Sequence, residues 1–210
     1  MGIDYPFGTP TGPGLLLADG SWVDGAPGRE WPGRTALVAV GSNVVASVVA
    51  AKLAAAGVAG DVPFVPGDVR DIGIAHSAHV SPGGYVPTTS FAETGALATL
   101  VVSWFTDAQL AALDATEPNY SRVPLPEDCG VPGAQVYVSR WGVLAPAGKP
   151  LRPTTQAEVH EVLAGDAGLA ALLPLADPEA AVSALRDPLT ARRVHERLVA
   201  IGWVFPTGLG

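Results

Sequence analysis

The feature that most constrains the fold is a short apolar run that ends in a turn and continues as a helix. Residues Thr35 to Val40 (TALVAV) suit a buried strand and are too few for a typical helix. Gly41-Ser42-Asn43 follows at once, and the next residues, VVASVVAAKLAAAG, are alanine-rich and of helix length. Gly57 at the end of this run favours a left-handed helix terminus. The segment therefore predicts a strand, a tight turn and a helix.

The Gly-Ser-Asn turn has two interpretations. Glycine permits a tight backbone turn, and Ser42 or Asn43 can cap the helix that follows. The first N–H groups of a helix are unpaired and carry partial positive charge, so a carboxylate or phosphate can bind there. A capped helix that binds nothing also explains these residues. Neither a P-loop nor the G-x-G-x-x-G pattern is present.

A second strand and helix lie downstream. Leu97 to Phe105 has a strand pattern, and Thr106 with Gln109 forms a capping box for a helix. Pro118 requires that helix to end, so Glu117 is expected just beyond it, in the extended geometry that precedes proline. A surface glutamate and a buried glutamate that acts as a general acid or base both fit this local sequence.

Read in order, the chain carries VGSN at Val40 to Asn43, SPGGYVPTT at Ser81 to Thr89, and LDATE at Leu113 to Glu117, followed by Tyr120. This order resembles the gamma-glutamylcyclotransferase-like family. Its members carry YGSN after the first strand and a catalytic glutamate in an LD-x-x-E segment, with a tyrosine soon after. The resemblance covers residues 36 to 125.

The resemblance implies a mixed α+β fold, in which helices surround a small mixed-strand barrel. It also implies release of 5-oxoproline from a gamma-glutamyl amine or peptide, by attack of the substrate's alpha-amine on its own gamma-carbonyl group. Glu117 is the implied general acid and base, since one carboxylate can serve both proton transfers in turn. No cofactor and no metal are implied, and the expected partner is a small molecule with a gamma-glutamyl head.

The substrate-binding residues that the resemblance implies are Val40, Gly41, Ser42, Asn43, Gly84, Tyr85 and Tyr120. The turn would hold the substrate's alpha-carboxylate on its N–H groups. Val40 departs from the family pattern, because it lacks the hydroxyl of the usual tyrosine. This departure implies either a shifted specificity or a loss of activity.

Two alternatives to the cyclotransferase stay open. One is a non-catalytic relative that binds a small ligand or a partner, and the other is an amide hydrolase or acyl-transfer enzyme that uses Glu117. A buried Glu117 beside the turn would favour either enzyme. A glutamate that points into solvent would favour the binding protein.

Other chemistry-bearing residues are less informative. His76 and His79 form an H-x-x-H pair, but a strand would place them on opposite faces, and no third metal ligand is nearby. Cys129 lies in a loop rich in proline and glycine, where a thiol nucleophile is not favoured over a structural cysteine. His160 and His195 lie inside expected helices and more simply pack there or face water.

Composition divides the chain into three stretches. Residues 1–34 hold eight glycines and five prolines, which predicts an irregular arm that Trp22 and Trp31 anchor. Residues 35–150 form the expected barrel domain, and residues 151–210 form a helical extension packed on it. Capping signals at Thr155, Asp177 and Asp187 predict helices there, at 156–164, 167–173, 178–186 and 188–200. Arg192, Arg193 and Arg197 form a basic face on the last of these.

Charge and apolar patterning exclude several classes. The net charge of −8 and the lack of a basic run argue against nucleic acid and against an anionic membrane surface. The longest apolar stretch is broken by polar residues, and the first residues do not form a signal peptide. A single cysteine excludes an intrachain disulfide and favours a cytoplasmic setting. The oligomeric state stays open.

Overall fold

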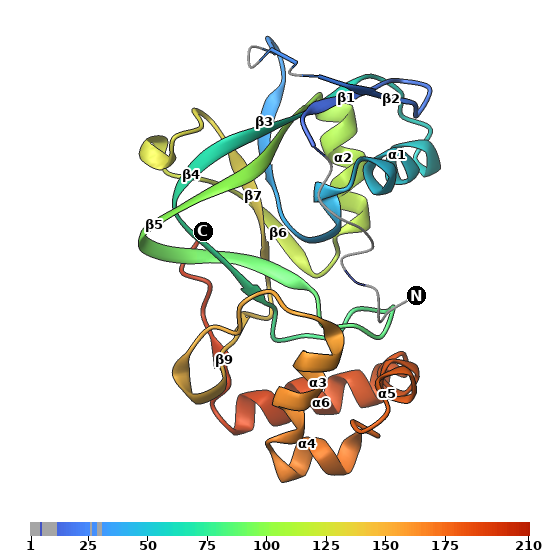
Figure 1. Cartoon of the computed structure of the whole chain (residues 1–210), viewed down its shortest axis with the longest axis vertical. Helices are drawn as coiled ribbons and strands as arrows, with labels where there is room; N and C mark the ends of the chain where they lie inside the picture. Colours follow the sequence, from blue (N-terminus) through green and yellow to red (C-terminus); the bar gives the residue numbers. More distant parts are fainter. Residues whose placement is uncertain (1–4, 6–11, 26, 29–30) are drawn as a thin grey trace. The chain divides into compact units, whose positions relative to one another are not determined.

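The computed structural model describes residues 5, 12–25, 27–28 and 31–210. In these ranges the chain is a mixed α+β protein with a seven-stranded mixed sheet, a two-stranded sheet and six α-helices (Figure 1). The residues group into two compact units. Unit 1 comprises residues 1–8, 74–91 and 141–207, and unit 2 comprises residues 9–73, 92–140 and 208–210.

The large sheet has the strand order β2-β1-β4-β5-β3-β7-β6. Its strands are β1 (Gly14–Leu16), β2 (Trp22–Asp24), β3 (Thr35–Ala39), β4 (Val62–His76), β5 (Thr88–Phe105), β6 (Tyr120–Pro124) and β7 (Gln135–Ser139). β3 runs parallel to β7 and antiparallel to β5, so the sheet is mixed, as expected. Among the described residues this order begins at β2 and ends at β6 without closing, and the expected barrel is not confirmed.

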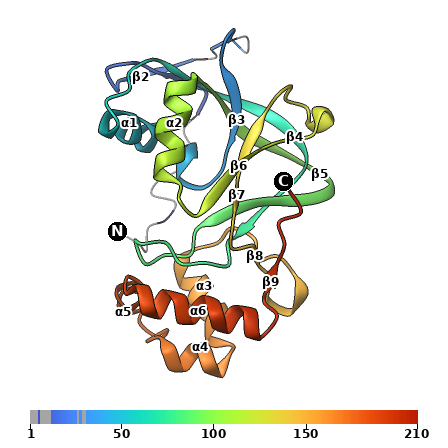
Figure 2. The same ribbon diagram turned by 180° about the vertical axis from the view of Figure 1, so that it is seen from behind.

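Unit 2 buries both faces of β3. Leu37 lies in one apolar cluster and Val38 in another, because successive side chains of a strand point to opposite faces. The Leu37 cluster is covered by α1 (Ala46–Ala55) and α2 (Asp107–Thr116), which pack against each other (Figures 1 and 2). The strand, turn and helix predicted from the sequence are therefore present in that order.

Unit 1 contains the remaining helices and the small sheet. The helices are α3 (Gln156–Ala164), α4 (Ala167–Leu172), α5 (Pro178–Leu185) and α6 (Pro188–Ala200), and the strands are β8 (Val143–Leu144) and β9 (Val204–Phe205). The four predicted helices are confirmed to within one residue at each end. Thr155, Asp177 and Asp187 cap α3, α5 and α6 as predicted, each accepting a backbone N–H, and Asp166 caps α4. No helix in the described ranges is long and apolar enough to cross a membrane.

Two expectations for the amino-terminal part differ from the structure. In the described portion of residues 1–34, β1 and β2 form a hairpin, so this part of the arm is more regular than predicted. Trp22 anchors it as expected, with its ring 5.6 Å from that of Phe64 in an edge-to-face contact. Trp31 instead lies against the Arg34 guanidinium group. The expectations for residues 1–4, 6–11, 26, 29 and 30 lie outside the described residues.

Candidate functional site

The turn after β3 brings Asn43 into the interior of unit 2. Gly41 has a φ of +64°, a left-handed conformation that glycine adopts without strain. Residues Gly41–Val44 then form a single 3-10 turn, η2, in which Asn43 is only 5% exposed. The prediction that Ser42 or Asn43 caps the helix is wrong. Val45 is the N-cap residue of α1, with no side-chain cap, since the Asn43 amide is engaged elsewhere.

Glu117 is held at the carboxyl end of α2. The predicted capping box of Thr106 and Gln109 begins this helix, and Glu117 is its C-cap residue before Pro118. The Glu117 N–H donates to the Asp114 carbonyl at 3.1 Å, and its own carbonyl accepts from the Tyr120 N–H at 3.0 Å. Its ψ of 53° differs from the extended geometry expected before proline, because these two turn bonds hold the backbone in a tighter bend.

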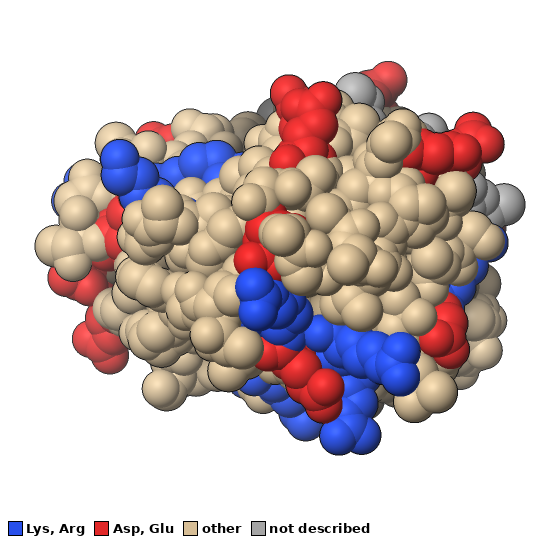
Figure 3. All heavy atoms as spheres, turned by 90° about the horizontal axis from the view of Figure 1, so that it is seen from below, with Lys and Arg blue, Asp and Glu red and all other residues tan. Residues whose placement is uncertain are grey.

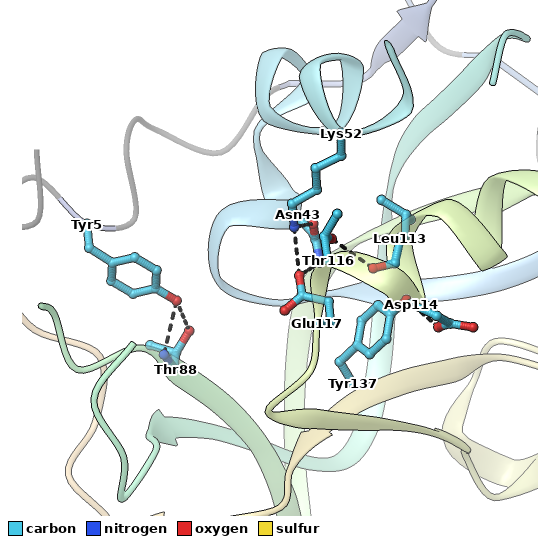
Figure 4. A network of polar contacts seen from close by, with 9 residues as sticks. All are labelled: Tyr5, Asn43, Lys52, Thr88, Leu113, Asp114, Thr116, Glu117 and Tyr137. Carbon is cyan, nitrogen blue, oxygen red and sulfur yellow. Dashed lines mark hydrogen bonds and ion pairs between the residues drawn. The ribbon is translucent and has the colours of Figure 1, made fainter. Parts of the chain in front are cut away.

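Three side chains from three elements meet at this point, and we call them the Asn43–Lys52–Glu117 cluster (Figure 4). Asn43 Nδ2 donates to Glu117 Oε1 at 3.1 Å. Lys52 Nζ, from α1, donates to the same oxygen at 2.6 Å and to Asn43 Oδ1 at 2.7 Å. The structure thus joins the two motifs of the resemblance and adds a lysine that the sequence analysis missed. The available signal in the sequence was that Lys52 is the only charged residue of the alanine-rich segment 44–57.

The cluster is partly open to solvent. Side-chain exposure is 17% for Lys52 and 15% for Glu117, so both charged groups are mostly covered but still reach water. Both bonds to the carboxylate end on Oε1, and Oε2 accepts none from the described residues. Two pockets of unit 2, of about 260 and 470 Å³, are lined by other residues. The cluster is therefore a polar site at the edge of the core.

A second polar network fixes the end of α2. The Tyr137 hydroxyl donates to Asp114 Oδ1 at 2.7 Å, and Arg122 holds the same carboxylate with two bonds of 2.9 and 2.8 Å. The hydrogen bonds from Arg122 lower the pKa of Asp114, and burial raises the pKa of Tyr137, so the phenol stays neutral. Because β6 carries Arg122 and β7 carries Tyr137, this network ties the last turn of α2 to both strands.

The other residues implied by the resemblance lie in both units. Val40, Ser42 and Tyr120 are half-buried in unit 2, where Val40 and Tyr120 pack against its apolar clusters. Gly84 and Tyr85 belong to unit 1.

In unit 1 the Tyr85 ring stacks on that of Tyr5, with their centroids 4.5 Å apart. The Tyr5 hydroxyl also accepts from the Thr88 N–H at 3.0 Å (Figure 4). Gly84 has a φ of +81° and lies against the backbone of α5, where a side chain would collide with the Val182 carbonyl. Both residues therefore have structural contacts inside unit 1.

No group of three or more metal-ligating side chains occurs in the part of the chain that the structure describes. His76 is fully buried, with Nδ1 bonded to the Val86 carbonyl and Nε2 accepting from the Thr154 N–H. His79 Nδ1 lies 2.6 Å from Ser77 Oγ, and burial lowers the pKa of His79 to about 3. Both histidines are thus buried and hydrogen-bonded. Cys129 is buried, and its Sγ lies 3.4 Å from the Val131 carbonyl.

The expected basic face of α6 is interleaved with acids. Arg192 pairs with Glu196 at 2.7 Å, and Arg197 pairs with Asp166 at 2.6 Å. Figure 3 likewise shows acidic and basic side chains next to each other on the face it presents. Charge neutralisation leaves little field there to attract a phosphate or an acidic partner.

No family model, no curated protein and no solved structure matches this chain. The resemblance to the gamma-glutamylcyclotransferase-like family therefore rests on the motif residues alone.

Proposed function

We propose that the chain is a gamma-glutamylcyclotransferase-like enzyme that releases 5-oxoproline from a gamma-glutamyl amine or peptide. The observation that carries the proposal is the 3.1 Å hydrogen bond from Asn43 Nδ2 to Glu117 Oε1. It joins the VGSN and LDATE motifs, which lie 74 positions apart in the chain. A chance likeness of two short motifs would not require them to meet in space.

In the proposed reaction, Glu117 moves one proton. The alpha-amine of the substrate forms a bond to the gamma-carbonyl carbon and loses a proton to Glu117. The bond from that carbon to the leaving nitrogen then breaks, and the leaving amine receives the proton. The products are 5-oxoproline and a free amine, and neither water nor a cofactor is consumed. Amine and carbonyl belong to one molecule, so the site chiefly has to select the conformer that brings them together.

The proposal extends to fold and setting. We infer that the seven-stranded sheet corresponds to the family's mixed barrel, with α1 and α2 packed outside it. Among the described residues, the parallel pairing of β3 with β7 supports a mixed sheet of this kind. A reducing compartment such as the cytoplasm suits the single free thiol of Cys129.

The test is 5-oxoproline release from a panel of gamma-glutamyl dipeptides, glutathione and gamma-glutamyl amines. Glu117→Gln keeps the size of the side chain and removes the base, so we expect a loss of kcat of at least about 100-fold. Glu127→Gln, which changes an exposed glutamate of the same unit, is the matched control and should leave the rate unchanged. Equal release by the wild type and by Glu117→Gln would refute the proposed base.

A second candidate is a non-catalytic protein that binds a small amino-acid-like ligand at the same place. The observation in its favour is the 2.6 Å ion pair with Lys52, which occupies Oε1 of the proposed base. Val40, with no hydroxyl group, points the same way. This candidate predicts ligand binding by the wild type with no 5-oxoproline formed from any member of the panel.

A further inference from the structure

We propose that the Lys52–Glu117 ion pair recognises the head group of an alpha-amino acid by exchanging partners with it. The ligand's alpha-ammonium group would replace Lys52 at the Glu117 carboxylate, and its alpha-carboxylate would bind the released Lys52 ammonium. This inference rests on the proposed function only for the location of the site. It assigns the alpha-carboxylate to Lys52, where the resemblance implies the backbone of the turn.

The charges of the pair and of the ligand are complementary. Lys52 Nζ and Glu117 Oε1 lie 2.6 Å apart and present one cation and one anion side by side. An alpha-amino acid carries an ammonium and a carboxylate group on a single carbon atom, at a similarly short spacing. A two-point ion exchange therefore pairs every charge. It selects ligands that carry both groups on the same carbon atom.

The exchange is energetically accessible because folding has already removed most of the water around both charged side chains. Removing a charge from water is expensive, and one partner is needed to offset it. In the free site each charge is already mostly desolvated, with 17% and 15% of the two side chains exposed. Exchange replaces one ion pair within the protein by two ion pairs with the ligand, so each protein charge keeps one partner and neither is left unpaired.

Asn43 holds the geometry in which the exchange takes place. Its Oδ1 accepts from Lys52 at 2.7 Å, and its Nδ2 donates to Glu117 at 3.1 Å. The residue is only 5% exposed and lies in the η2 turn, so its amide has a defined position between the two charges. After the exchange, Oδ1 can accept from the ligand's ammonium group and Nδ2 can donate to its carboxylate.

Two ion pairs among the described residues of unit 2, Lys52–Glu117 and Asp114–Arg122, differ in how firmly they are held. Lys52 reaches the Glu117 carboxylate with one bond through a flexible four-carbon stem and donates a second bond to Asn43, while Glu117 Oε2 accepts no bond from the described residues. Asp114, in contrast, is held by two bonds from Arg122 and one from Tyr137. Arg122 therefore binds both oxygens of Asp114, whereas Lys52 binds only one oxygen of Glu117. The Lys52–Glu117 ion pair is thus the easier of the two to break.

The test is isothermal titration calorimetry with three amides that differ only in their charged groups. L-Glutamine carries both groups, 4-aminobutanamide lacks the carboxylate, and glutaramic acid lacks the amine. Lys52→Met should weaken L-glutamine and glutaramic acid about 10-fold or more and leave 4-aminobutanamide unchanged or tighter. Glu117→Gln should show the mirror pattern, weakening L-glutamine and 4-aminobutanamide only.

Two further variants serve as controls for the effect of Lys52→Met. Lys149→Met changes the only other lysine, which is exposed, and should leave all three affinities unchanged. Lys52→Arg keeps the positive charge and should bind L-glutamine within a few-fold of the wild type, even if Lys52→Met folds poorly. Equal weakening of all three ligands by Lys52→Met would mean that the lysine only positions Glu117. That result, or no binding of L-glutamine to the wild type, would overturn the inference.

The outcome is separable from that of the proposed function, since binding is measured without turnover. A protein that shows the exchange pattern but releases no 5-oxoproline from the gamma-glutamyl panel would keep this inference and refute the cyclotransferase. A protein that releases 5-oxoproline with a KM unchanged by Lys52→Met would do the reverse.

Discussion

The two units bury polar groups in different ways. Both units pair charges at the margins of their cores, as Lys52 with Glu117 in unit 2 and Arg197 with Asp166 in unit 1, but only unit 1 also buries histidines. All four histidines of the chain belong to unit 1, and three of them, His76, His79 and His160, are at most 5% exposed. A buried carboxylate or ammonium needs a partner, whereas an imidazole can enter a core as a neutral group.

The difference has a consequence for pH. Burial lowers the pKa of each of these three histidines, since a low-dielectric interior disfavours the cation. Neither ring nitrogen of His160 has a hydrogen-bond partner among the described residues, so none of these would compensate a charge there. Unit 2 contains no histidine, and hydrogen bonds from Arg122 lower the pKa of its Asp114. Unit 1 should therefore be the acid-sensitive one.

The largest expected effect on stability comes from replacing one buried leucine by alanine in the core of each unit. Leu163 in unit 1 and Leu37 in unit 2 are both fully buried in apolar clusters. Leu163→Ala and Leu37→Ala should each reduce the free energy of unfolding by about 2–5 kcal/mol, through lost burial and the cavity left behind. Urea denaturation measures the loss, and hydrogen exchange shows which unit loses protection. A loss below about 1 kcal/mol for one variant would mean that its unit is loosely packed.

Lowering the pH should destabilise unit 1 more than unit 2, with an effect smaller than that of the core substitutions. Because the folded-state pKa of His79 is about 3, the unfolded chain binds a proton near pH 6.5 that the folded chain does not. Stability is therefore complete above pH 6.5 and falls as the pH drops, by about 2 kcal/mol at pH 5 for this histidine. Hydrogen exchange at pH 7 and pH 5, corrected for intrinsic rates, measures the change in each unit.

The control for the pH experiment is His79→Gln, which removes one buried imidazole and should reduce the pH dependence of unit 1 accordingly. His195 offers no equivalent control, since it is only half-buried on α6. An equal loss of protection in unit 2 between pH 7 and pH 5 would contradict the comparison, because that unit contains no histidine.

The smallest effects concern single ion pairs. Asp114→Ala removes the acceptor of Tyr137 and of Arg122, and the carboxylate is 40% exposed. Solvent screening limits the expected loss of stability to about 1–2 kcal/mol. Glu196→Ala, in the exposed Arg192–Glu196 pair of unit 1, should cost less than about 0.5 kcal/mol. Thermal or urea unfolding measures both. Equal losses would mean that the partial burial of Asp114 contributes nothing.

Local signals predicted the helices well and the amino-terminal hairpin poorly. The capping residues Thr106, Thr155, Asp177 and Asp187 act through bonds to their own helix, so a few neighbouring residues are enough to identify them. β1 and β2 were missed because they are three residues long and lie among glycines and prolines. β1 also pairs with β4, which lies about fifty positions away in the chain.

The sequence by itself determined where the backbone turns and where the helices begin and end. It also placed Glu117 at the end of a helix, because caps, prolines and glycines act within a few residues. Only the tertiary structure decided what surrounds that glutamate. Asn43 and Lys52 lie 74 and 65 positions from Glu117, and local sequence holds no record of such contacts. Asn43 was expected to cap a helix, but the folded chain gives its amide two charged partners, which bind it more strongly than a neutral backbone N–H would.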